Sequence, residues 1–272
     1  MPFTQRDKTR IHYEWHPGPA QDSPVLALIP GLASNTRSFP ELLERLAKSF
    51  AVLVFDPRGA GQTKLASLRF QLSDSADDLA AVMNDIGLDT AHVLGISMGG
   101  MIAQEFVLRH PHRVETLSLS VTTCGPPPGV SPSPATIAAL VKGIVNAPRV
   151  RSLDDVVRLF GDLLFSPTCD FATRRRFFKM RRDARPGPVR NSIAQLLAIR
   201  QFRSHRRLSQ VVAPTLVLGA LDDHLVPPIN SDILYASIPG SRLVKLNAGH
   251  CSFYEVQEEF VGEIERFVEA RN

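Results

Sequence analysis

Short apolar runs alternate with longer amphipathic segments between residues 25 and 120, and few folds are compatible with this alternation. Runs rich in valine, isoleucine and leucine predict strands buried on both faces, as in a parallel sheet covered by helices. The expected strands are Val25–Ile29, Ala51–Phe55, Ala91–Gly95 and Val114–Ser120. Three- and four-residue apolar spacing predicts helices over Phe39–Ser49 and Ser73–Ile86, and we expect Ile11–Trp15 to add an antiparallel edge strand.

The alternation stops after this half of the chain and resumes near its end. Strands at Thr215–Gly219 and Arg242–Leu246 and a closing helix at Glu255–Ala270 are expected to complete the sheet. The intervening stretch opens with the proline-rich segment Cys124–Pro134, which suits neither a strand nor a helix interior. It then shows helical patterns and no strand pattern, at Ala135–Asn146, Ser152–Phe165, Phe171–Arg182 and Val189–Gln201. We therefore expect a core domain of residues 1–121 and 211–272, with a helical cap inserted at 122–210.

Composition excludes several classes of protein. A chain of 272 residues with 44% hydrophobic content can bury one large core, so a disordered or fibrous protein is not expected. No apolar run reaches membrane-spanning length and the first residues lack a signal-peptide core, which predicts a cytoplasmic protein. The cysteines at 124, 169 and 251 form no Cys-x-x-Cys pair, and the histidines show no metal-ligand spacing. We expect neither a disulfide framework nor a metal site.

Gly95-Ile96-Ser97-Met98-Gly99 lies between an expected strand and a helix-like segment, Gly100–Leu108. The G-x-S-x-G pattern in this context is typical of a sharp turn that exposes a nucleophilic serine. Side chains at positions 95 and 99 would collide with the neighbouring strand or helix, so both positions require glycine. The sequence therefore predicts Ser97 as a nucleophile.

A serine hydroxyl needs a base and a carboxylate that orients the base. His250 follows the last expected strand and precedes the closing helix, which predicts that it lies at the same sheet edge as Ser97. Two acids, Asp222 and Asp223, directly follow the preceding expected strand. The chain order of serine, acid and histidine is the one expected when these residues act together on a sheet of this kind. His224, beside the acids, is expected to have a surface or loop role.

Three motifs make the chain resemble the α/β-hydrolase family over nearly its whole length outside the insertion. Asp56-Pro57-Arg58-Gly59-Ala60-Gly61 is similar to the family's D-x-R-G-x-G loop, Ser97-Met98-Gly99-Gly100 to its elbow, and Gly249-His250 to its histidine loop. The resemblance implies an eight-stranded, mostly parallel sheet flanked by helices, and a cofactor-free enzyme. Alignment of Asp223–Pro227 with the family's D-x-x-V-P pattern implies Asp223 as the acid, with Asp222 as the alternative. Residues 121–125, where some relatives carry the acid, contain no carboxylate.

The resemblance also implies an oxyanion hole of two backbone N–H groups. One belongs to Met98, which follows the nucleophile, and by position Leu32 supplies the other. Here Pro30-Gly31 replaces the family's usual histidine-glycine pair. The donor can survive this change because it is a backbone group, although the segment could also be an ordinary β-turn.

Positive charge is concentrated in the expected cap. Residues 168–207 contain eleven arginines and one lysine against two aspartates, a balance of +10 in a chain whose net charge is +4. Such a cluster could attract an anionic substrate, dock an acidic protein, contact a membrane surface, or form a solvated helix face. Nucleic-acid binding is not expected because no recognised module accompanies the cluster.

These residues together predict a serine hydrolase that cleaves a small or medium carboxylic ester, lactone or thioester through an acyl-enzyme. By resemblance, similar elbows occur in carboxylesterases, enol-lactonases and carbon–carbon bond hydrolases. Acyl transfer, or carbon–carbon cleavage on the same three residues, is the alternative enzyme activity, and a binding module on this scaffold is the non-enzyme alternative. Ser97 argues against the epoxide hydrolases and haloalkane dehalogenases, which carry aspartate at the elbow.

Overall fold

The computed structural model describes residues 2–65, 67–146, 152–185 and 187–271. Its strands are β1 (Phe3–Arg6), β2 (Thr9–His16), β3 (Val25–Ile29), β4 (Ala51–Phe55), β5 (Ala91–Ile96), β6 (Val114–Ser120), β7 (Thr215–Ala220) and β8 (Arg242–Leu246). Its α-helices are α1 (Pro40–Leu46), α2 (Leu72–Asp85), α3 (Met98–Arg109), α4 (Pro134–Asn146), α5 (Leu153–Leu164), α6 (Phe171–Asp183), α7 (Val189–Gln201), α8 (Ile229–Ser237), α9 (Ser252–Glu255) and α10 (Gln257–Glu269).

The eight strands form one sheet in the order β1-β2-β4-β3-β5-β6-β7-β8. The six strands from β4 to β8 in this order are parallel to one another, whereas β2 pairs in antiparallel fashion with both β4 and β1. Ile29 at the end of β3 is opposite Gly95, and Ile96 at the end of β5 is opposite Ser120. The segments that follow these strands therefore emerge side by side at one sheet edge. The predicted eight-stranded, mostly parallel sheet is confirmed.

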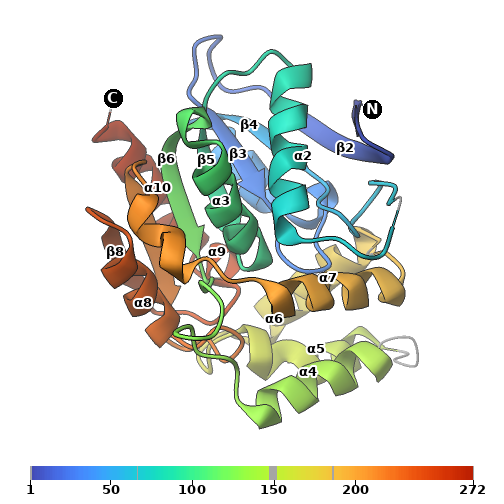
Figure 1. Cartoon of the computed structure of the whole chain (residues 1–272). Coiled ribbons are helices and arrows are strands. Elements are labelled where there is room, and N and C mark those ends of the chain that lie inside the picture. The colour runs from blue at the N-terminus through green and yellow to red at the C-terminus, as the bar shows by residue number, and fades with distance from the viewer. Residues whose placement is uncertain (1, 66, 147–151, 186, 272) are drawn as a thin grey trace.

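Helices cover both faces of the sheet, so the core strands are apolar along their whole length. Side chains of α2, α3 and α8 pack into the core on one face, and those of α1, α9 and α10 pack into the core on the other. Figure 1 shows α2 and α3 in front of the sheet, with α10 behind it. Because the helices of these layers cover the two faces, the carboxyl edge of the sheet is occupied by the segments that follow the strands.

One predicted element was wrong in detail, and a short helix that was not predicted precedes another. β2 is not an edge strand, because the short β1 pairs with it through a hairpin whose residue Asp7 has φ 52°. β1 is only four residues long and has no apolar alternation, so its pairing could not be inferred locally. The predicted closing helix at Glu255–Ala270 corresponds to α10, and the short helix α9 precedes it, separated from it by Val256 with φ −127° and ψ 50°.

In the described part of the chain between β6 and β7 lie four α-helices, α4 to α7, and we call them the cap helices. Figure 1 shows them below the carboxyl ends of the strands. Phe177 and Phe178 of α6 pack among core aromatics, and the rings of Phe177 and Phe253 have centroids 6.3 Å apart. Ala194 and Ala198 of α7 join the core on the other side. The cap helices are thus packed on the edge at which Ser97 lies.

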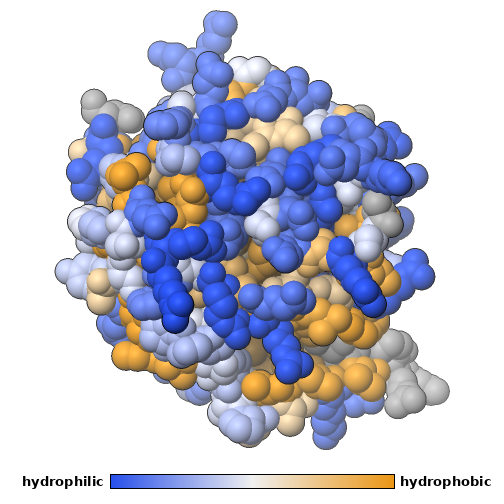
Figure 2. Space-filling view, viewed as in Figure 1, coloured by the Kyte–Doolittle hydropathy of each residue, from blue (hydrophilic) through white to orange (hydrophobic). Residues whose placement is uncertain are grey.

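The surface of the cap helices is partly apolar. Figure 2 shows hydrophobic residues gathered on the lower part of the molecule, where the cap helices lie. On α4 the exposed apolar side chains are Ile137, Val141 and Val145. None of the helices in the described part of the chain is long and apolar enough to cross a bilayer.

Candidate active site

Ser97 lies in the turn between β5 and α3, with φ 58° and ψ −118°. A positive φ is costly for a residue with a side chain, so the surrounding contacts must hold this conformation. The Ser97 N–H donates to the Ser120 carbonyl over 2.9 Å, and the Thr122 hydroxyl donates to the Ser97 carbonyl over 2.7 Å. All of these contacts use the backbone of Ser97, which leaves its hydroxyl free to act outside the turn.

Gly95 and Gly99 let the strand and the helix meet tightly around this turn. A Cβ at Gly95 would lie 2.5 Å from the Gly99 carbonyl oxygen, and one at Gly99 would overlap the Ile29 carbonyl oxygen. Neither obstacle is a flexible side chain, so the backbone itself would have to shift. The predicted collision at both positions agrees with this geometry.

The variant Gly99→Ala is expected to lower the free energy of unfolding by about 3 kcal/mol or more, since overpacking against rigid backbone is costly. Urea unfolding followed by circular dichroism measures the change. Gly262→Ala is the control, because a Cβ there meets only the flexible Arg266 side chain and alanine favours the helix. Unfolding of Gly99→Ala at the wild-type urea midpoint would disprove the proposed tight fit.

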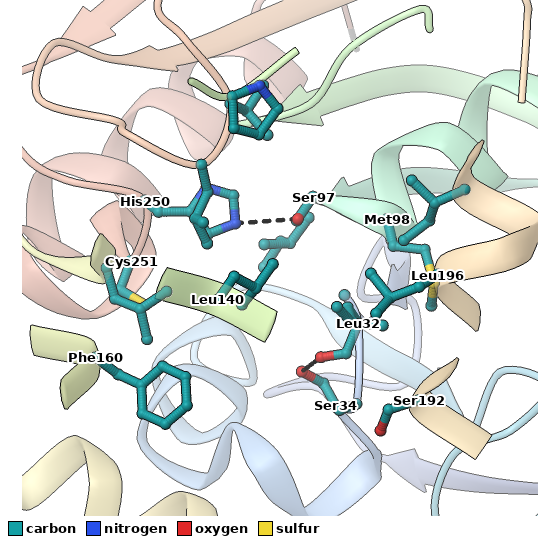
Figure 3. A pocket seen from close by; sticks show the side chains of 18 of the residues that line it. Leu32, Ser34, Ser97, Met98, Leu140, Phe160, Ser192, Leu196, His250 and Cys251 are labelled. Carbon is teal, nitrogen blue, oxygen red and sulfur yellow. Dashed lines mark hydrogen bonds between the residues drawn. The ribbon is translucent and has the colours of Figure 1, made fainter. Parts of the chain in front are cut away.

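His250 lies in the loop between β8 and α9 and is largely buried. Its Nδ1 is 2.7 Å from Asp223 Oδ2, and its Nε2 is 3.0 Å from Ser97 Oγ. Figure 3 shows a ring nitrogen of His250 directed at the Ser97 hydroxyl. Because an ionised carboxylate only accepts, Nδ1 donates to Asp223 and Nε2 is left to accept from the serine hydroxyl.

Asp223 rather than Asp222 faces the histidine. Asp223 is buried, and its Oδ1 accepts from the N–H groups of Leu225 and Val226, each over 2.8 Å. These bonds fix the carboxylate with Oδ2 toward the imidazole. Asp222 is partly exposed and donates its N–H to the Ala248 carbonyl over 3.0 Å, and His224 is exposed.

The loop after β3 forms a β-turn, because the Ser34 N–H donates to the Gly31 carbonyl over 3.1 Å. We call residues 31–34 the oxyanion turn, after the role that the sequence predicts for Leu32. A Cβ at Gly31 would come within 3.3 Å of the Ser97 Cβ, so the turn begins against the serine. Among the described residues, neither the Leu32 nor the Met98 N–H donates to a protein acceptor, and both residues line the cavity at Ser97. Both residues predicted to supply the oxyanion hole therefore lie in the wall of this cavity.

Two side chains of the cap helices hold the oxyanion turn, and local sequence patterns did not reveal them. Ala33 has φ 53°; its N–H donates to Gln195 Oε1 over 2.9 Å, and its carbonyl accepts from Arg181 Nη2 over 2.8 Å. Gln195 also donates to the Arg58 carbonyl over 2.9 Å and thereby joins the turn to the Asp56–Gly61 loop. These contacts join residues that are more than 130 positions apart, so no spacing rule predicts them.

A further residue that sequence reasoning missed, Glu255, supports the histidine loop. Its Oε2 accepts from the Gly249 N–H over 3.0 Å and from the Ser166 N–H over 3.1 Å. The Cys251 N–H donates to the Leu164 carbonyl over 2.8 Å. The loop that carries His250 is therefore tied to the segment after α5.

A cavity of about 970 Å³ opens at Ser97 and lies between the core and the cap helices. Its wall is mainly apolar, and Figure 3 shows Leu140, Phe160 and Leu196 around it. This volume suits a small or medium substrate. Within the described ranges, no three His, Cys, Asp or Glu side chains gather as a metal site would require.

Comparison with known proteins extends this picture. A sequence model of the alpha/beta hydrolase fold family matches residues 24–155 and 157–256. "Putative carbamate hydrolase RutD" of Caulobacter vibrioides is 25% identical over 261 residues, which are 93% of each chain. The 2-hydroxy-6-oxononadienedioate/2-hydroxy-6-oxononatrienedioate hydrolase of Cupriavidus pinatubonensis is 30% identical over 236 residues, covering 85% of this chain and 79% of that protein.

Solved structures share the fold. The enol-lactonase from Burkholderia xenovorans superposes with a TM-score of 0.80 at 23% identity, covering 98% of this chain and 100% of that one. At such identity the likeness concerns the fold alone. The family model and the 30% identical relative, however, span most of the chain. This chain therefore belongs to the α/β-hydrolase family and is a hydrolase.

Proposed function

We propose that the protein is a serine hydrolase that cleaves a small or medium carboxylic ester, lactone or thioester through an acyl-enzyme. The observation that carries the proposal is the chain of contacts from Asp223 through His250 to Ser97, with distances of 2.7 and 3.0 Å. Hydrolysis as such agrees with the family. The choice of serine as nucleophile rests on this geometry.

In the proposed mechanism, Ser97 Oγ attacks the substrate carbonyl while His250 Nε2 takes the hydroxyl proton. The carbonyl π electrons move to oxygen, and the Leu32 and Met98 N–H groups stabilise the resulting oxyanion. When the carbonyl re-forms, the bond to the leaving group breaks, and His250 returns the proton to that group. Water then repeats both steps on the acyl-enzyme, releasing the acid and regenerating Ser97. Asp223 holds the imidazole in the required tautomer throughout.

Cleavage of a carbon–carbon bond is the second candidate activity. The relative that is 30% identical over 85% of this chain carries the name of a dienedioate hydrolase and supports this candidate. The carbamate hydrolase name of another relative adds a carbamate to the substrates that should be tested. These activities can use the same three residues, and they differ in which bond of the substrate is broken. Acyl transfer also shares them and requires that an acceptor outcompete water.

The proposal is tested with a fluorophosphonate probe and a panel of p-nitrophenyl esters, lactones, thioesters, carbamates and β-diketones. We expect one probe molecule to attach to each protein molecule, with peptide mass spectrometry identifying Ser97. Product analysis with and without an added alcohol separates hydrolysis from acyl transfer. Absence of labelling together with absence of turnover on every substrate would refute the proposal.

A further inference from the structure

Arg181 brings a positive charge from helix α6 to the oxyanion turn. Its Nη1 donates to Ser34 Oγ over 2.6 Å and its Nη2 donates to the Ala33 carbonyl over 2.8 Å. Both acceptors are uncharged, and together they occupy two of the five N–H groups of a guanidinium. Arg181 also lines the cavity that contains Ser97, and it is half-buried.

Arg181 differs from the other arginines of its helix because it has no counter-ion among the described residues. Arg174 pairs with Asp162 and Arg175 with Asp154, each over 2.7 Å, whereas no described carboxylate lies within salt-bridge distance of Arg181. Burial lowers the pKa of the Arg181 guanidinium, but arginine keeps its charge in proteins. The neighbouring Cys251 cannot neutralise it, because burial raises the pKa of this thiol well above its usual value.

The rest of the cavity wall has the same sign of charge. Its described lining residues include three further arginines, Arg182, Arg200 and Arg203, and no aspartate or glutamate. These three are exposed, whereas Arg181 is not, so the positive charge extends from the solvent-facing part of the wall to the oxyanion turn. A desolvated cation without a partner is unfavourable, and an anion bound beside it would offset that cost.

We infer that the substrate carries a carboxylate, which Arg181 binds while Ser97 attacks a carbonyl of the same molecule. This inference rests on the proposed function, because it concerns a ligand of the same cavity. Gly31 begins the oxyanion turn against Ser97, and Ser34 ends it against Arg181. The ends of a β-turn are less than about 7 Å apart, so the carboxylate and the attacked carbonyl are joined by a short chain. The mainly apolar wall accommodates that chain and the leaving group.

The inference is tested by comparing p-nitrophenyl hydrogen glutarate with p-nitrophenyl methyl glutarate, which differ in the charge of the distal carboxyl group. We expect wild-type protein to prefer the anionic ester in kcat/KM by at least about 10-fold. Arg181→Gln should lower this preference by about 10- to 100-fold, because a charge-assisted hydrogen bond is lost. Arg181→Lys should retain part of the preference, since it keeps the charge.

Lys179→Gln is the matched control. Lys179 is an exposed cation of the same helix that does not line the cavity, so its removal changes the net charge equally. The preference should stay within about twofold of the wild-type value, because surface charges are screened. A loss of preference in this control as large as in Arg181→Gln would show a general field rather than a carboxylate site.

If Arg181 only holds the oxyanion turn, Arg181→Gln should lower kcat/KM equally for both esters. This result would overturn the inference. If Arg181→Gln fails to fold, Arg181→Lys answers the same question through the ratio of the two substrates. Calorimetric titration of glutarate into the Ser97→Ala protein, with and without Arg181→Gln, tests the anion site without turnover. Glutarate binding that requires Arg181, without hydrolysis of any ester, would contradict the proposed function and leave the anion site standing. Ester hydrolysis without discrimination by charge would contradict the anion site and leave the proposed function standing.

Discussion

Replacement of Ser97 by alanine is expected to lower kcat for ester hydrolysis by about 10⁴- to 10⁶-fold, the range typical for loss of a catalytic serine. The hydroxyl makes one hydrogen bond to a described residue, with His250, whereas the backbone of residue 97 holds the turn. Alanine keeps those backbone contacts and the positive φ, so the fold should survive. We expect the melting temperature to change by only a few degrees.

Steady-state rates with p-nitrophenyl esters and fluorophosphonate labelling measure this effect. Ser192→Ala is the matched control, because Ser192 lines the same cavity and lies away from His250 in Figure 3. The hydrolysis rate of that variant should stay within about threefold of the wild-type rate, and the probe should still label it. A substitution away from the three reacting residues has little effect. If Ser97→Ala retained more than about one per cent of the wild-type rate, the acyl-enzyme mechanism would be untenable.

Asp223→Asn is the second large effect, with an expected loss of about 10³- to 10⁴-fold in kcat. The Leu225 and Val226 N–H groups require an acceptor at Oδ1, so the asparagine amide oxygen should occupy that position. Its NH₂ group then faces His250 Nδ1 and donates to it. The imidazole proton is forced onto Nε2, which can no longer accept the proton of Ser97.

The neighbouring Asp222→Asn provides a control with the same chemical change. Asp222 is partly exposed, and its contact with the Ala248 carbonyl uses its backbone N–H. The rate should therefore change by less than about twofold, as is usual for a surface substitution. The two variants are compared by kcat at saturating ester and by their thermal unfolding. Equal losses in both would contradict the assignment of Asp223 as the orienting acid.

The alternation of apolar runs with amphipathic segments was sufficient to predict the sheet of the core. A strand buried on both faces must be apolar along its length, and this signal is visible in β3, β4 and β5 without any tertiary information. β1 lacks that signal, because four residues at the edge of a sheet need not alternate or be apolar. Edge pairing depends on the neighbouring strand, which is why only the structure revealed it.

The placement of Ser97, Asp223 and His250 at one edge also followed from the sequence. Each residue lies in the segment that follows a strand, and parallel strands place their carboxyl ends together. Ser97 and His250 are 153 positions apart, yet they meet because β5, β6, β7 and β8 are consecutive neighbours in the sheet. The choice between Asp222 and Asp223 depended on family resemblance, because both follow the same strand. Their catalytic roles stay predictions until the variants are measured.

The contributions of the cap helices were decided by tertiary structure alone. The sequence indicated that residues 168–207 are strongly basic, and this property does not distinguish a solvated arginine from one that lines a cavity. Arg174 and Arg181 lie on the same helix, but only the tertiary packing of α6 shows that Arg174 pairs with Asp162 whereas no described carboxylate pairs with Arg181. Local periodicity determines strands, helices and the turns between them, because it reflects burial along one element. The partners of Arg181, Gln195 and Glu255 depend on how distant elements pack, which local periodicity does not encode.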